Sequence, residues 1–83
     1  MLHKIFSVYD SKAELYLTPF FMKTKGEAVR GFEDVANDKN SAIGRHPEDY
    51  TLFDLGEYDD CSAVFSLHKT PIAVGVALEF VKS

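Results

Sequence analysis

The stretch TKGEAVRGFEDVAN (Thr24–Asn37) decides the fold, because no other segment of the sequence has so clear a helical pattern. Thr24 and Glu27 have the spacing of a capping box, in which two side chains satisfy free backbone N–H groups at the start of a helix. Apolar residues then recur along one face, at Ala28, Val29, Phe32, Val35 and Ala36. We therefore expect an amphipathic helix over residues 25–37.

Two glycines lie within this expected helix. Gly26 and Gly31 each weaken it by roughly 1 kcal/mol relative to alanine. Both lie off the apolar stripe, which leaves open whether another part of the molecule packs closely against them.

Strand-forming patterns lie on both sides of the helix. Residues 2–9 (LHKIFSVY) and 13–22 (AELYLTPFFM) precede it, and Pro19 favours an edge strand or a kink in the second stretch. After a polar loop over residues 38–49, strands are expected at 50–55, 63–68 and 72–81, with turns at 56–62 and 69–71. The last stretch alternates large and small side chains, which favours a strand over a helix beginning at Pro71.

This order of elements predicts an α+β fold. We expect one domain (residues 1–83) in the order β-β-α-β-β-β, with a small, mostly antiparallel sheet of four to five strands and the helix packed on one face. A chain of 83 residues has a thin core. Because small domains often gain stability by assembling, a homodimer is plausible.

Composition and motifs exclude several classes of protein. One cysteine, Cys61, cannot form an internal disulfide, and no apolar run approaches the ~18 residues of a membrane span. His3, His46 and His68 are too scattered for a zinc motif, and phosphate- or dinucleotide-binding motifs are lacking. We therefore expect a cytoplasmic protein without enzyme activity, metal, cofactor or membrane contact.

The net charge of −4 is unevenly distributed. Residues 1–45 carry seven Lys/Arg and six Asp/Glu, whereas residues 46–83 carry two and seven. In the first half, cations lie among aromatic residues, and this combination suits single-stranded nucleic acid, whose phosphates and bases they contact. The candidate residues are Lys4, Lys12, Lys23, Lys25 and Arg30 for phosphates and Tyr9, Tyr16 and Phe20 for stacking. The competing interpretation is that these aromatic residues form the core.

The second half contains an acidic group, Asp54, Glu57, Asp59 and Asp60. Its spacing is not that of a calcium-binding loop, so a solvated turn is the simpler interpretation. The same carboxylates also suit docking onto another protein.

Three segments carry a resemblance to a known family: FSVYDSKAE (6–14), PFFMKTKGEAVRGFEDVAND (19–38) and HPEDYTLFDLGEYDD (46–60). Their order and spacing resemble the small nonstructural protein of Microviridae bacteriophages of the gokushovirus-like branch. The C-terminal stretch 72–80 is matched least well.

The resemblance implies a nonstructural accessory protein of genome replication, located in the cytoplasm of the infected bacterium and not in the virion. It implies binding of single-stranded DNA, during the switch to single-stranded genome synthesis. The small number of basic candidates predicts that this binding is weak and sensitive to salt. The alternative is an acidic adaptor that docks on a host or phage replication protein without binding DNA. The resemblance supplies no set of functional residues.

Overall fold

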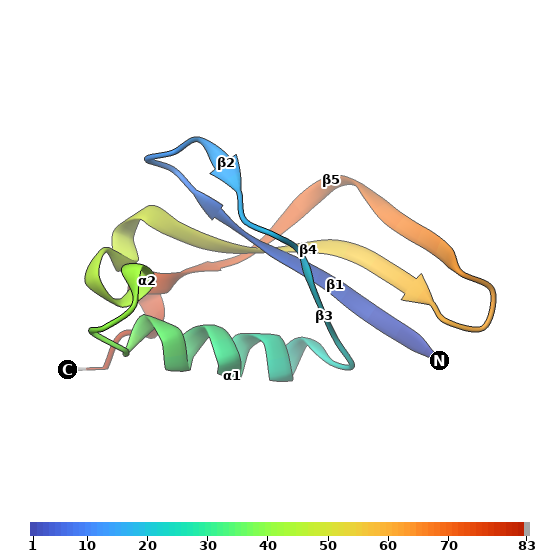
Figure 1. The fold of residues 1–83 in the computed structure, drawn as a ribbon, viewed down its shortest axis with the longest axis horizontal. Helices are drawn as coiled ribbons and strands as arrows, with labels where there is room; N and C mark the ends of the chain where they lie inside the picture. Colours follow the sequence, from blue (N-terminus) through green and yellow to red (C-terminus); the bar gives the residue numbers. More distant parts are fainter. Residues whose placement is uncertain (83) are drawn as a thin grey trace.

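The structure, a computed structural model, describes residues 1–82 and confirms the α+β class. Figure 1 shows a curled antiparallel sheet with one main helix along one face. The strands are β1 (Leu2–Asp10), β2 (Leu15–Tyr16), β3 (Phe20–Met22), β4 (Tyr50–Asp59) and β5 (Val64–Val76). The helices are α1 (Lys25–Ala36), α2 (Ala42–Arg45) and the 3-10 turns η1 (Pro47–Asp49) and η2 (Ala77–Phe80).

Strand β1 is the centre of the sheet. It pairs with β4 on one side and with the short strands β2 and β3 on the other, and β5 pairs with β4 at the outer edge. The stretch predicted as one strand over 13–22 is divided into β2 and β3. Pro19 lies in the break, as expected for a residue that has no backbone N–H for the ladder.

Helix α1 begins as its sequence predicts. The Thr24 hydroxyl accepts a hydrogen bond from the Glu27 backbone N–H at 3.1 Å. Its buried residues Ala28, Phe32 and Ala36 pack against side chains of the sheet, including Phe6, Val8 and Leu52. At Gly31 an added Cβ would have no neighbour within 4 Å, so no close packing explains this glycine.

The second half of the chain differs from the expected order. The loop expected over 38–49 contains two short helices, α2 and η1. The three strands expected after it are replaced by two long strands, β4 and β5. Strand β4 continues through Gly56, whose φ of 139° suits glycine alone, so the turn expected over 56–62 is much shorter. Strand β5 continues through Pro71, which an edge strand tolerates. The strand expected over 72–81 ends at Val76, and η2 follows.

The molecule is elongated, with principal extents of 42 × 24 × 17 Å. The tip of the β4–β5 hairpin projects past the first turn of α1, beside the N-terminus (Figure 1). Among residues 1–82, no helix is long and apolar enough to cross a membrane.

Candidate functional site: the open aromatic face of the sheet

The two faces of the sheet differ in what covers them. Along β1, Phe6 and Val8 belong to the core beneath α1. Because successive side chains of a strand point to opposite faces, Ile5, Ser7 and Tyr9 lie on the face that α1 does not cover. Each residue of a neighbouring strand lies on the same face as the residue with which it is paired, so the register assigns the other side chains to the two faces.

A first group of aromatic rings lies on the uncovered face, near the β1–β2 turn. It consists of Tyr9, Tyr16 and Phe53, from three different strands. The Tyr9 and Tyr16 rings have centroids 4.9 Å apart, and the Tyr16 and Phe53 rings are 5.5 Å apart and nearly perpendicular. Tyr16 is 46% exposed, so this group offers ring surface to solvent.

A second group lies towards the tip of the β4–β5 hairpin. Phe21 is opposite Ile5, and Phe65 is opposite Tyr58, which places all three rings on the uncovered face. Ring centroids are 5.9 Å apart for Phe21 and Tyr58 and 4.7 Å apart for Tyr58 and Phe65. Phe21 and Phe65 are about half exposed, at 47% and 56%. We call the two groups together, Tyr9, Tyr16, Phe21, Phe53, Tyr58 and Phe65, the open aromatic face.

The strand carboxylates lie on the other side of the sheet. The register pairs Asp54 with Phe6, Glu57 with Lys4 and Asp59 with Leu2, and all three partners lie on the α1 side of β1. Asp10, two residues after Val8, lies on that side as well. The open aromatic face therefore lacks a strand carboxylate, although the chain is acidic.

The acidic hairpin turn is bonded to the start of the chain. The Met1 amino group donates to Asp60 Oδ1 at 2.7 Å, and His3 Nε2 lies 2.7 Å from Asp60 Oδ2. These two hydrogen bonds lower the pKa of Asp60 to about 2, and the same contact raises the pKa of the Met1 amino group. Asp54 likewise lies 3.1 Å from His68 Nε2. The carboxylates predicted for docking are thus largely engaged within the chain.

The predicted stacking residues are divided between the two faces. Tyr9 and Tyr16 are brought together on the open aromatic face. Phe20, however, is opposite Phe6 and stacks on it with centroids 5.9 Å apart, so its ring belongs to the core side. The register with β1 decides this placement, because adjacent residues of a strand face opposite ways.

The predicted cations do not form one cluster. Lys12 lies in the turn between β1 and β2, and Lys23 directly follows β3. Lys4 is on the α1 side of β1, with its Nζ atom 3.9 Å from Glu57. Lys25 and Arg30 lie on α1 itself. Only Lys12 and Lys23 are close in sequence to rings of the open aromatic face.

Four rings of this face are not among the sequence candidates: Phe21, Phe53, Tyr58 and Phe65. Phe53 could have been found from alternation, since it follows Leu52, which is buried in the core. Tyr58 lies in a segment with the composition of a turn, and Phe65 lies in a strand that the sequence predicts to be shorter, over residues 63–68. Only the register that joins β4 to both neighbours places these rings together.

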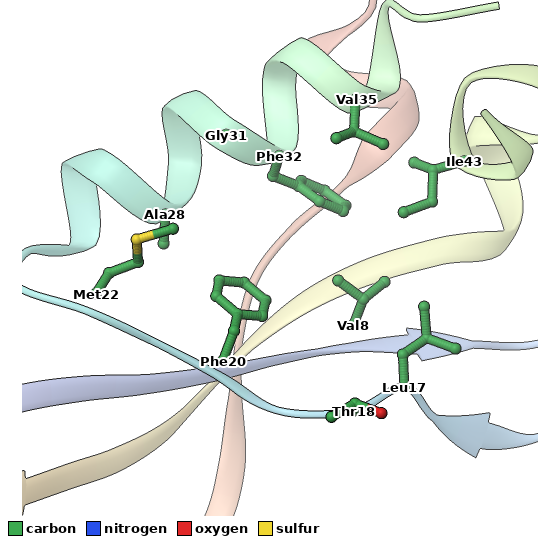
Figure 2. Close-up of a pocket in the computed structure, with 10 residues that line it drawn as sticks. All are labelled: Val8, Leu17, Thr18, Phe20, Met22, Ala28, Gly31, Phe32, Val35 and Ile43. Atoms are coloured by element: carbon green, nitrogen blue, oxygen red, sulfur yellow. The ribbon is translucent and has the colours of Figure 1, made fainter. Parts of the chain in front are cut away.

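An apolar pocket lies on the opposite side of the sheet, between α1 and the chain from Leu17 to Met22 (Figure 2). Its volume is about 350 Å³. Figure 2 labels Phe20, Phe32, Val8 and Ile43 among its lining residues. Thr18 supplies the only hydroxyl of the lining and no charged group contributes, so the pocket lacks the polar groups that usually orient a specific ligand.

Two exposed groups of side chains bring three metal-ligand atoms within 4.8 Å of one another. They are His46 with Glu48 and Asp49, and Asp59 with Asp60 and Cys61. Both carboxylate oxygens of Asp60 already have partners, so the second group has few free ligands. Such exposed clusters are common without a metal, and neither supports a metal site.

These features define a small α+β protein with one sheet face covered by a helix and the other aromatic and partly exposed. Residues 3–80 match the family model of the phage ORF5 protein, so the chain belongs to this family of phage proteins. No curated protein and no solved structure gives a significant match.

Proposed function

We propose that this phage protein binds single-stranded DNA on its open aromatic face and acts as a nonstructural accessory protein of genome replication. The observation that carries the proposal is the six rings gathered on one uncovered sheet face. Proteins that bind single strands without sequence preference stack bases on such rings, each base contributing about 1–3 kcal/mol. The place of action would be the cytoplasm of the infected bacterium, during synthesis of single-stranded genomes and outside the virion.

The distribution of charge supports this use of the face. Phosphates approaching the rings meet no strand carboxylate, since Asp54, Glu57 and Asp59 lie on the α1 side. Lys12 and Lys23 are the cations that lie nearest the rings along the chain. Each phosphate contact adds about −0.7 to the slope of log affinity against log salt, so two contacts give weak, salt-sensitive binding.

The most exposed ring of each group provides the test. Tyr16→Ala and Phe65→Ala should each weaken binding of a fluorescein-labelled oligothymidylate by five-fold or more, which corresponds to the loss of one stacked base. Fluorescence anisotropy at ~50 mM salt measures this, because low salt favours phosphate contacts.

The matched control is Leu15→Ala. Leu15 precedes Tyr16 in β2, is 49% exposed and lies on the opposite face, opposite Asp10. It should leave the affinity unchanged. No binding by the unaltered protein, or an equal loss in all three variants, would refute the proposal.

The alternative is an adaptor that docks on a host or phage replication protein without binding DNA. It is favoured by the unpaired outer edge of β5, whose residues 64–73 are all exposed. Because Asp60 is bonded within the chain, this edge offers a freer docking surface than the acidic turn does. A replication protein captured from infected cells by both the unaltered protein and the Tyr16→Ala variant, without DNA binding by either, would favour the adaptor.

A further inference from the structure

The outer edge of the sheet is formed by β5, and its first five residues, 64–68, include neither a lysine nor a proline that would protect an edge from pairing. Of its 13 residues, the ten from Val64 to Ala73 are exposed on both faces. Large apolar side chains lie among them, with Phe65 56% and Leu67 63% exposed. An exposed edge of this kind is a template for pairing with another strand. The opposite edge, by contrast, consists of strands of two and three residues.

The monomer also exposes more surface than is expected for a compact chain of the same mass. Its accessible surface is 5400 Å², whereas a compact chain of 9.3 kDa is expected to expose roughly 5,000 Å². Its radius of gyration is 13.1 Å, against about 12 Å expected for this length. The projecting β4–β5 hairpin accounts for the elongated outline in Figure 1.

The charges along the hairpin indicate which partner fits the edge. Asp59 ends β4 and Asp60 begins the turn, whereas the middle of β5 carries Lys69 and no carboxylate lies between Val64 and Val76. Antiparallel pairing of two identical hairpins brings Lys69 of each copy next to the acidic turn of the other. Parallel pairing would place like charges together.

We propose that β5 pairs antiparallel with β5 of a second copy of this chain, about a two-fold axis near Ser66. Phe65 of each copy then lies beside Leu67 of the other, so that these exposed apolar side chains contact each other across the axis. The pairing spans residues 64–68, because β5 begins at Val64 and the axis places Val64 opposite His68 of the other copy. The contact is self-complementary, as a two-fold interface must be.

This pairing has a consequence for the open aromatic face. A two-fold axis perpendicular to the sheet keeps the uncovered faces of both copies on one side, so the rings of the two molecules form one continuous surface. The use of that surface for DNA rests on the proposed function. The pairing itself is measured without DNA, so the two proposals can fail separately.

Charge variants at Leu67 test the dimer. Size-exclusion chromatography with light scattering over a concentration series should give a dimer for the unaltered protein and monomers for Leu67→Lys and for Leu67→Glu. An equimolar mixture of these two variants should restore the dimer, because the opposite charges meet across the axis. Leu15→Lys, on the other edge of the sheet, should remain dimeric, and circular dichroism checks that each variant is folded.

Three results would contradict the pairing. The unaltered protein could stay monomeric at every concentration, one of the Leu67 variants could stay dimeric alone, or the mixture of the two variants could stay monomeric.

A second measurement uses the native cysteine in the unaltered protein. Cys61 is exposed in the hairpin turn, five positions from Ser66. At about 3.3 Å per residue, the antiparallel pair separates the two Cys61 residues by roughly 30 Å. Spin labels on Cys61 should give this distance by pulsed electron resonance, whereas a distance below about 15 Å, or no coupling between the labels, would contradict the arrangement.

Discussion

At the scale of single residues, Asp60 has the most perturbed ionisation among residues 1–82. Hydrogen bonds from the Met1 amino group and from His3 lower its pKa from 3.8 to about 2. Because the pKa is lower in the folded state, the ionised carboxylate stabilises the fold above pH 3.8. This contribution is lost as the pH falls towards 2.

We therefore predict that Asp60→Asn removes a part of the pH dependence of stability. The variant should melt at a lower temperature than the unaltered protein at pH 5, and the difference should shrink as the pH falls from about 4 to about 2. Circular dichroism melting curves across this range measure the effect. Asp59→Asn is the matched control, because its carboxylate lies farther from the Met1 amino group, at 3.9 Å. Parallel curves for Asp60→Asn and the unaltered protein would contradict the role of the pair.

The sequence alone does not predict which of the neighbouring residues Phe20 and Phe21 faces the helix. Alternation requires them to face opposite sides of the sheet, but it does not say which one faces the helix. The pairing of Phe20 with Phe6 and of Phe21 with Ile5 decides it. The predicted stacking residue Phe20 therefore lies on the core side, and Phe21 takes its place on the open aromatic face.

At the scale of elements, α1 was predictable almost completely. Its N-cap at Thr24 and its apolar stripe are local signals, and local signals do not depend on the rest of the fold. The β4–β5 hairpin was less predictable, because Gly56 and Pro71 usually indicate turns. In this fold Gly56 lies at a β-bulge and Pro71 lies on an edge, where each is compatible with a strand.

Helix α1 contains a glycine that lowers its stability and that alanine can replace. Gly31 lies within α1, and an added Cβ would meet no atom within 4 Å, so Gly31→Ala should raise the free energy of unfolding by about 1 kcal/mol. Denaturant unfolding measures the change. At Gly75 a Cβ would lie 2.9 Å from the Phe80 ring, so Gly75→Ala should lower stability. A destabilised Gly31→Ala variant would show that this glycine has a role that the packing does not explain.

At the scale of the whole molecule, the acidic net charge and a DNA-binding face are compatible. The carboxylates of the strands lie on the α1 side. Asp54, and Asp60 in the turn, also have hydrogen-bond partners within the chain. The sequence indicated that acidity is concentrated in residues 46–83, but the division between the faces depends on the register of β1 with β4. That register joins residues far apart in the chain, so composition alone does not predict it.

The most direct test of the account is to observe the rings while DNA is added. In aromatic NMR spectra titrated with oligothymidylate, the rings of the open aromatic face should shift progressively, above all the most exposed ones, Tyr16, Phe21 and Phe65. The core rings of Phe6 and Phe32 beneath α1 should stay in place. If no ring of the open aromatic face shifts, or if the shifts are confined to the α1 side, then this face does not bind single-stranded DNA.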